Sequence, residues 1–103
     1  MKTPHLKSMC VAFATNVIGD KWTPKLLSAL AQGSLRFGEL QEMSGGINPR
    51  TLCQRLTDLE EMGVIQKVAP KGDEMHGAYA LTKKGEDLVP ILKQMSAWGE
   101  KYQ

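Results

Sequence analysis

The sequence has few of the residues that most often carry out catalysis or bind metal. Its 103 residues include only two cysteines and two histidines, and aromatic residues make up 6% of the chain. Cys10 and Cys53 lack the spacing of a metal-binding pair, and two cysteines do not make a disulfide framework. His5 and His76 have no Asp, Ser or Cys at a catalytic spacing. We therefore expect no enzyme activity, no metal site and no cofactor.

Long hydrophobic runs and a strong excess of one charge are also missing. No apolar stretch approaches the roughly 18 residues that span a bilayer, and the N-terminus lacks an apolar signal core. The lack of a spanning run and of a signal core favours a soluble protein. The low cysteine content favours the reducing cytoplasm as its location. The 13 Lys and Arg residues against 11 Asp and Glu give a formal net charge of +2. This total neither requires nor excludes a nucleic-acid partner, so the distribution of charge has to decide.

The hydrophobic residues that are present predict a mainly helical chain. A hydrophobic content of 42% suffices for one modest core, and the length predicts a single domain over 1–103. Apolar residues at helical spacing predict a first helix that stops at Gly19. A second helix is expected to begin near Thr23, whose hydroxyl would cap it. A short third helix follows, with Phe37 and Leu40 facing inward.

The order of the elements favours one known arrangement. Beyond Gly63, residues 64–69 and 77–82 have strand-like composition and predict a two-stranded hairpin. Thr82 is expected to cap a final helix, which Pro90 near its start would kink. Three helices, a sharp turn, a fourth helix, a hairpin and a last helix form a winged helix-turn-helix, with the hairpin as the wing.

The helix after the turn at 44–46 occupies the place of the recognition helix in that arrangement. Asn48 is a preferred N-cap residue, so the start of the helix is sharply specified. At 100° per residue, Leu52, Leu56 and Leu59 fall within a narrow arc that must face the core. The opposite side of this helix is therefore expected to be exposed.

The exposed side of this helix changes charge along its length. Its first turns carry Arg50, Thr51 and Gln54, which donate to phosphates and base edges, whereas the acids of 58–61 would be repelled by DNA. Arg55, nearer the core, is expected to reach a backbone phosphate or to pair with an acid one turn on. We expect the helix to enter a DNA groove by its N-terminal end, which the helix dipole also makes positive. The alternative is an amphipathic helix with an ordinary solvated face.

Residues outside this helix are further candidates for DNA contact. Arg36, ahead of the short helix, and Lys67, on a strand, are candidates for contacts with the phosphate backbone. Lys71 and His76 lie in the predicted wing, but the acids at 73–74 between them would weaken its attraction to DNA. The alternative for each of these residues, taken singly, is that it belongs to the ordinary solvated surface and does not contact DNA.

The two terminal helices have more apolar residues than one small core absorbs. The residues predicted to form a symmetric interface are Met9, Phe13, Leu88, Ile91, Leu92, Met95, Trp98 and Tyr102. The alternative is that these residues pack on the core of their own chain. Because a twofold protein reads two half-sites, we expect a homodimer on a pseudo-palindromic operator.

Several spaced segments resemble one family. The segments "VIGDKWTPKLLSAL", "RFGEL", "GINPRTLCQRLTDLEEMGVI", "YALTKKG" and "LVPILKQMSAWG" are similar to the HxlR-type bacterial winged helix-turn-helix transcriptional regulators, relatives of the MarR group. This resemblance runs from about Cys10 to Gly99. It implies a homodimer that binds double-stranded operator DNA and has no catalytic activity. It also places a set of residues at or near DNA: Asn48, Arg50, Thr51, Gln54 and Arg55.

The resemblance also implies a thiol sensor and leaves the wing open. Cys10 stands where some family members carry a redox- or electrophile-sensing cysteine. Lys7 and the amino end of the helix would favour the reactive thiolate form of Cys10. The alternative is that Cys10 is an inert packing residue, because it lies on the same apolar stripe as Phe13. Thr57 replaces a frequent basic residue, and residues 74–76 replace the Pro-Pro-Arg often found in the family wing.

A different function remains as the alternative. A winged-helix module that binds another protein through its apolar terminal helices would have much the same composition. A steep loss of affinity with rising salt is expected only for DNA binding. A pocket for a small-molecule or electrophile effector between the terminal helices and the DNA-binding core is also conceivable, but no residue identifies its ligand.

Overall fold

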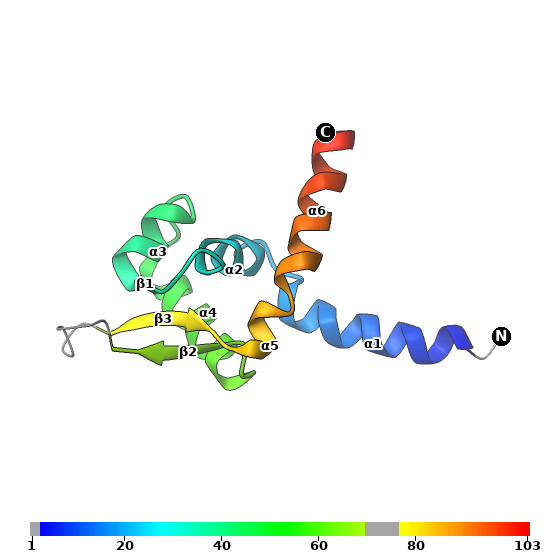
Figure 1. The fold of residues 1–103 in the computed structure, drawn as a ribbon, viewed down its shortest axis with the longest axis horizontal. Helices are drawn as coiled ribbons and strands as arrows, with labels where there is room; N and C mark the ends of the chain where they lie inside the picture. The colour runs from blue at the N-terminus through cyan, green and yellow to red at the C-terminus, as the bar shows by residue number, and fades with distance from the viewer. Residues whose placement is uncertain (1–2, 70–76) are drawn as a thin grey trace.

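The computed structural model describes residues 3–69 and 77–103, with side chains from residue 10 onward in these ranges. The elements are α1 (Thr3–Ile18), α2 (Thr23–Leu30), β1 (Leu35–Arg36), α3 (Phe37–Met43), α4 (Pro49–Glu61), β2 (Ile65–Val68), β3 (Ala78–Leu81), α5 (Lys83–Glu86) and α6 (Val89–Tyr102). Figure 1 shows α2, α3, α4 and the sheet gathered into one body, from which α1 and α6 extend in different directions. In the described part of the chain, no helix is long and apolar enough to cross a membrane.

Asp20, and not Thr23, caps the start of α2. Its Oδ1 accepts hydrogen bonds from the amides of Trp22 and Thr23, both at 2.8 Å. The Thr23 hydroxyl is buried and donates to the other oxygen of the same carboxylate. The prediction that Thr23 caps this helix is therefore wrong, because Thr23 already lies inside the first turn. An aspartate three residues upstream is a strong capping signal that the sequence does contain.

A glycine turn aims α4 away from α3. Gly45 and Gly46 adopt φ angles of 88° and 82°, a left-handed conformation that side chains with a Cβ rarely adopt. The side-chain oxygen of Asn48 accepts hydrogen bonds from the amides of Arg50 at 2.8 Å and Thr51 at 3.4 Å. The predicted N-cap of α4 is confirmed.

The sheet has one strand more than the sequence predicted. Its order is β1-β3-β2, antiparallel throughout, with Leu35 opposite Tyr79 and Ile65 opposite Leu81. The predicted two-stranded hairpin is present as β2 and β3. β1 was missed because two residues are too short to leave a periodic pattern, and only its partner strand makes them a strand.

The predicted final helix is divided in two. Thr82 does act as a cap, but of the short α5, where its hydroxyl oxygen accepts the Gly85 amide at 3.2 Å. Pro90 lies in the first turn of α6. Because proline has no N–H to donate to the carbonyl four residues earlier and its ring crowds that carbonyl, the helix stops after α5 and starts again in a new direction.

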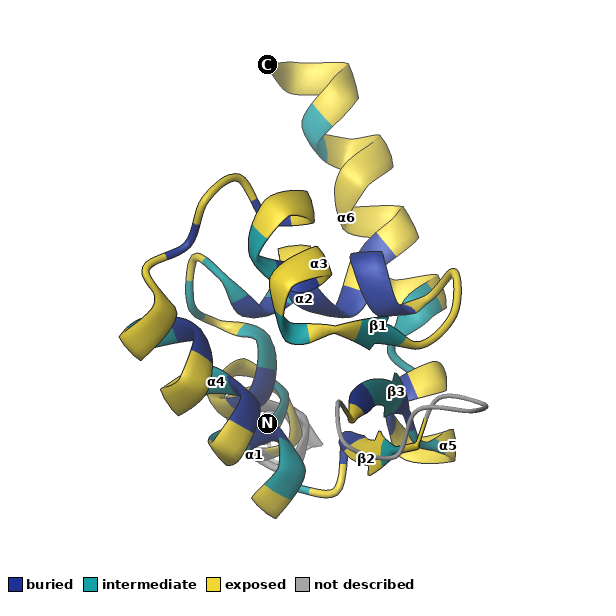
Figure 2. Cartoon of the chain, turned by 90° about the vertical axis from the view of Figure 1, so that its left-hand side faces the viewer, coloured by how far each residue is buried: buried dark blue, intermediate teal, exposed yellow. Residues whose placement is uncertain are grey.

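The core lies between the sheet and helices α2, α3 and α4. Figure 2 shows its dark blue segments on the inner sides of these elements, while most of α6 is exposed. Leu52, Leu56 and Leu59 are 0–2% exposed, as the helical pattern predicts. The buried hydrophobic cluster consists of Val17, Leu26, Leu27, Ala29, Leu30, Leu40, Ile47, Leu52, Leu56, Leu59, Val64, Ile65, Leu81 and Leu92.

Candidate nucleic-acid interface

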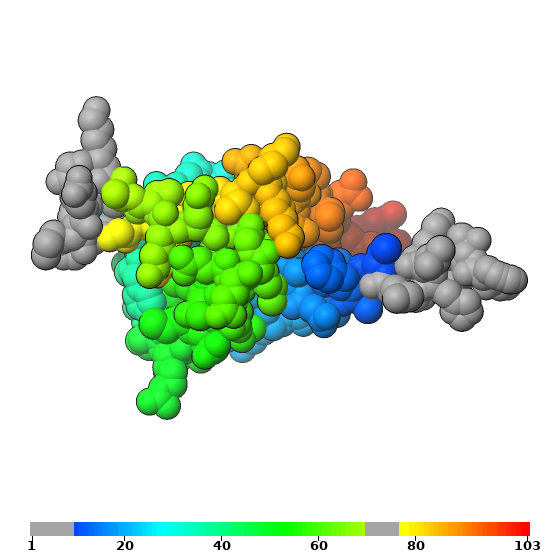
Figure 3. Space-filling model, turned by 90° about the horizontal axis from the view of Figure 1, so that it is seen from below, coloured from blue at the N-terminus to red at the C-terminus, as the bar shows by residue number. Residues whose placement is uncertain are grey.

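The outer side of α4 is open to solvent along its length. Arg50, Gln54, Thr57 and Glu61 are all exposed, opposite the buried leucines. Figure 3 shows this helix, in green, on the surface of the molecule seen from below. The N-terminal turn therefore presents the exposed Arg50 side chain at the positive end of the helix dipole, while Asn48 accepts hydrogen bonds from the amides of Arg50 and Thr51.

Side chains in the middle of α4 are tied to one another. Asp58 accepts a hydrogen bond from Gln54 Nε2 at 2.9 Å and pairs closely with Arg55. Arg55 also lies 3.6 Å from Asp20, measured from Nη1 to Oδ2. Of the two roles expected for Arg55, the structure thus contains the pairing with an acid one turn on, and a phosphate contact by Arg55 stays a prediction.

Asp20 links the start of α2 to α4. Burial raises the pKa of this carboxyl group, but hydrogen bonds from the Thr23 hydroxyl and from the Thr23 and Trp22 amides lower it, and so does the positive charge of the nearby Arg55 guanidinium. The net effect holds the pKa of Asp20 below its usual value. Asp20 therefore stays ionised near neutral pH, and its charge offsets part of that of Arg55.

A shallow hollow beside α4 is lined by residues that lie far apart in the sequence. It has a volume of about 440 Å³ and lies between Asp20 and Trp22 on one side and the first two turns of α4 on the other. The lining residues from α4 are Arg50, Thr51, Gln54 and Arg55. Trp22 was missed because it is far from α4 in the sequence, and only the folded chain brings the two to one hollow.

The other predicted DNA contacts are more scattered. Arg36 and Lys67 are exposed on β1 and β2. The Arg36 amide donates to Glu39 Oε1 at 2.8 Å, which completes a capping box at the start of α3. Lys71 and His76 lie outside the residues that the structure describes.

The terminal helices expose a set of large apolar side chains. Trp98 and Tyr102 are 68% and 63% exposed, and their rings are 5.2 Å apart. Exposed apolar residues on α1 and α6 are Val11, Phe13, Ile91, Met95, Trp98 and Tyr102. Leu92 and Leu88 instead pack in and against the core of their own chain, so the exposed face is narrower than predicted. The side chain of Met9 lies outside the described residues.

Cys10 and Cys53 are both exposed, and neither forms a disulfide. Cys10 lies on α1 and Cys53 on α4. The Phe13 side chain near Cys10 in the sequence is 60% exposed, so this stretch of α1 is not buried against the core of its own chain. The side chain of Lys7 lies outside the described residues.

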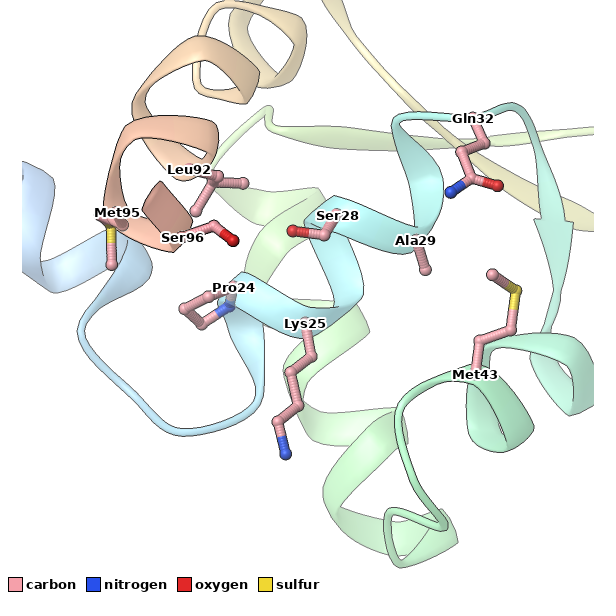
Figure 4. A pocket seen from close by; sticks show the side chains of 9 residues that line it. All are labelled: Pro24, Lys25, Ser28, Ala29, Gln32, Met43, Leu92, Met95 and Ser96. Carbon is pink, nitrogen blue, oxygen red and sulfur yellow. The ribbon is translucent and has the colours of Figure 1, made fainter. Parts of the chain in front are cut away.

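A groove of about 540 Å³ separates α6 from α2 and α3. Figure 4 shows Leu92, Met95 and Ser96 on one side of it, with Ser28 and Pro24 facing them from α2. Lys25 extends away from Leu92 and Met95. The groove lies between a terminal helix and the central body of the chain, which is the place where the sequence leaves an effector pocket conceivable.

The fold and the open helix after the glycine turn define a winged helix-turn-helix protein. Residues 17–103 match the HxlR-like helix-turn-helix family. The chain belongs to this family of transcriptional regulators.

Individual relatives agree with this assignment. The HTH-type transcriptional regulator YdeP of Bacillus subtilis is 38% identical over 88 residues, which are 85% of this chain and 69% of the relative. The structure of the redox regulator HypR in its oxidised form is 33% identical, covers 90% of this chain and 96% of that chain, and has a TM-score of 0.82. A structure described as a MarR-family transcriptional regulator from Enterococcus faecalis is 31% identical, with coverages of 93% and 87% and a TM-score of 0.79.

Proposed function

We propose that the chain acts as a homodimer that binds a pseudo-palindromic operator and regulates transcription from it. The observation that supports this most is the open N-terminal end of α4, where Arg50 is exposed next to the amides capped by Asn48. The acids at the other end of the helix keep that end away from the phosphates. This polarity fits insertion of α4 into the major groove by its N-terminal turns.

Salt dependence tests DNA binding against the alternative of a protein-binding module. A protein that neutralises several phosphates loses affinity with a slope of about −0.9 per phosphate in a plot of log K against log salt. We would select genomic fragments bound by the purified protein and measure this slope on the best fragment. An absence of selected fragments, or a flat salt profile, would favour the protein-binding module.

Arg50→Ala is expected to weaken operator binding by about 1–3 kcal/mol, because a bidentate contact with a guanine edge is worth this much. Gln54→Ala should weaken binding in the same assay. The measurement is a gel mobility shift on the selected operator, with Lys93→Ala on α6 as the control for a lost surface charge. If both α4 variants shift the operator as the parent does, α4 is not the reading helix.

The exposed apolar face of α1 and α6 supports the homodimer. Ile91 and Met95 are 48% and 46% exposed, and Trp98 and Tyr102 continue the same side of α6 for two further turns. A row of apolar side chains on a helix that leaves the body of the chain is typical of a protein interface. A second copy of the chain covers such a face symmetrically.

Trp98→Glu is expected to convert the homodimer to a monomer, since a charge would then be buried at the centre of the apolar face. Sedimentation velocity at micromolar concentration measures the change. Lys93→Glu, on the opposite side of α6 by the helical angle, is the control and should leave the dimer intact. A monomeric parent protein would contradict the proposal.

We also propose that Cys10 makes DNA binding sensitive to oxidants or electrophiles. Its exposed thiol is open to reagents, and the similarity to the redox regulator HypR supports a response of this kind. Operator binding by the parent is expected to change on titration with a quinone, while Cys10→Ser should be insensitive. Cys53→Ser serves as the matched control. Equal responses of the parent and Cys10→Ser would exclude Cys10.

A further inference from the structure

Two lysines flank a tryptophan at the start of α2. The Nζ atoms of Lys21 and Lys25 lie 5.0 and 5.1 Å from the centroid of the Trp22 ring, within the range of cation–π attraction. Both lysines are exposed, while the indole is half-buried and packs against the core. Because the Trp22 ring is held by the core, it restricts where the two ammonium groups lie. We call the Trp22 ring, with Lys21 and Lys25 against it, the support.

The support lies beside the proposed recognition helix. Trp22 lines the same hollow as Arg50, Thr51 and Gln54, so the start of α2 and the first two turns of α4 form one continuous surface. Figure 4 shows Lys25 extending from α2 on the side away from α6. A duplex that receives the tip of α4 in its groove would bring a phosphate strand along the edge of that groove, next to this support.

Within the described residues, Lys21, Lys25 and Arg50 give this surface an excess of positive charge. Asp20 is the acid that lines the hollow in the described part of the chain, and its carboxylate is engaged by Arg55 and by the first turn of α2. Among the residues that the structure describes, neither Lys21 nor Lys25 has a carboxylate oxygen within 4.0 Å. Both ammonium groups are therefore available to an external anion.

We infer that Lys21 and Lys25, held against Trp22, bind backbone phosphates of the DNA strand that borders the groove occupied by α4. This inference rests on the proposed function and adds contacts from α2 to it. The contacts are to phosphates and not to bases, so they strengthen binding to all sequences equally and position the recognition helix. Holding each lysine against the ring reduces the conformational entropy lost on binding.

The test measures log K against log salt for the full-length chain on its selected operator and on an unrelated duplex. Lys21→Gln and Lys25→Gln should each make the slope less steep by about 0.9, and each should lower affinity about fivefold near 0.15 M salt. The loss should be equal on both duplexes. Lys93→Gln, which removes the same charge from α6, should keep the parent slope.

The results of this test distinguish a failure of the Lys21 and Lys25 contacts from a failure of DNA binding as a whole. A parent with a steep salt slope and α2 variants with that same slope would overturn the α2 contacts and leave the DNA-binding proposal standing. A loss confined to the operator would also overturn the inference, because it would indicate base reading. A parent without affinity for DNA would overturn both.

Discussion

Leu52→Ala is expected to lower the free energy of unfolding by about 2–5 kcal/mol, the range for a leucine removed from a packed core. Leu52 is 0% exposed and lies on the buried side of α4, one turn from the capped end that we propose reads DNA. The cavity left behind removes contacts that hold this end of the helix in place. Urea denaturation at a fixed protein concentration measures the loss, since dimerisation would make stability depend on concentration.

Met43→Ala is the matched control for this change. Met43 is 51% exposed, so its truncation removes apolar contact without a closed cavity. We expect a loss of less than about 1 kcal/mol at this position. A similar loss at Leu52 and Met43 would contradict the packing of α4 on the core.

Gly85→Ala is expected to destabilise the fold by about 1–3 kcal/mol through overpacking. A Cβ at this position would lie 2.2 Å from the Val64 carbonyl oxygen and 3.1 Å from Leu81 Cδ2. The close approach comes from the docking of α5 on the turn at 62–64 that follows α4, where Thr82 Oγ1 donates to Gly63 O at 2.5 Å and Lys84 Nζ donates to Met62 O at 2.7 Å. The added methyl group would push these elements apart.

Gly38→Ala provides a comparison with the opposite sign. Gly38 is also helical, in α3, but a Cβ there would meet nothing within 4 Å. Alanine should therefore stabilise the protein by about 0.5–1 kcal/mol through its higher helix propensity. Thermal unfolding of both variants at one protein concentration measures these two changes in stability, a loss for Gly85→Ala and a gain for Gly38→Ala. A neutral or stabilising Gly85→Ala would show that α5 does not dock tightly on the turn that follows α4.

Local sequence signals predicted the start and the buried side of α4 well, because they act within a few residues of one another. The Asn48 side chain caps amides two and three residues on, and the leucines of α4 follow the period of the helix itself. The same kind of signal at Asp20 was present but was not used. The stop at Pro90 was expected only as a kink and proved to be a division into two helices.

Contacts between distant segments could not be predicted in this way. Leu35 and Arg36 form a strand only because β3 is beside them, and nothing within two residues encodes that partner. The placement of Trp22 next to α4 and the ion pair between Arg55 and Asp20 likewise depend on the tertiary fold, which brings residues 20–22 beside α4. The sequence predicted the apolar excess of α6 but included Leu92 in it, and packing decided that this leucine belongs to the core.

The sequence by itself determined which segments form helices, where the recognition helix begins and which of its sides is buried, since caps, glycine turns and apolar periodicity are local. Only the tertiary structure decided that the start of α2 shares a surface with that helix, that the sheet has a third strand, and that α6 leaves the body of the chain with its apolar face uncovered. These features depend on the packing of segments that are far apart along the chain, and residue spacing alone does not specify that packing.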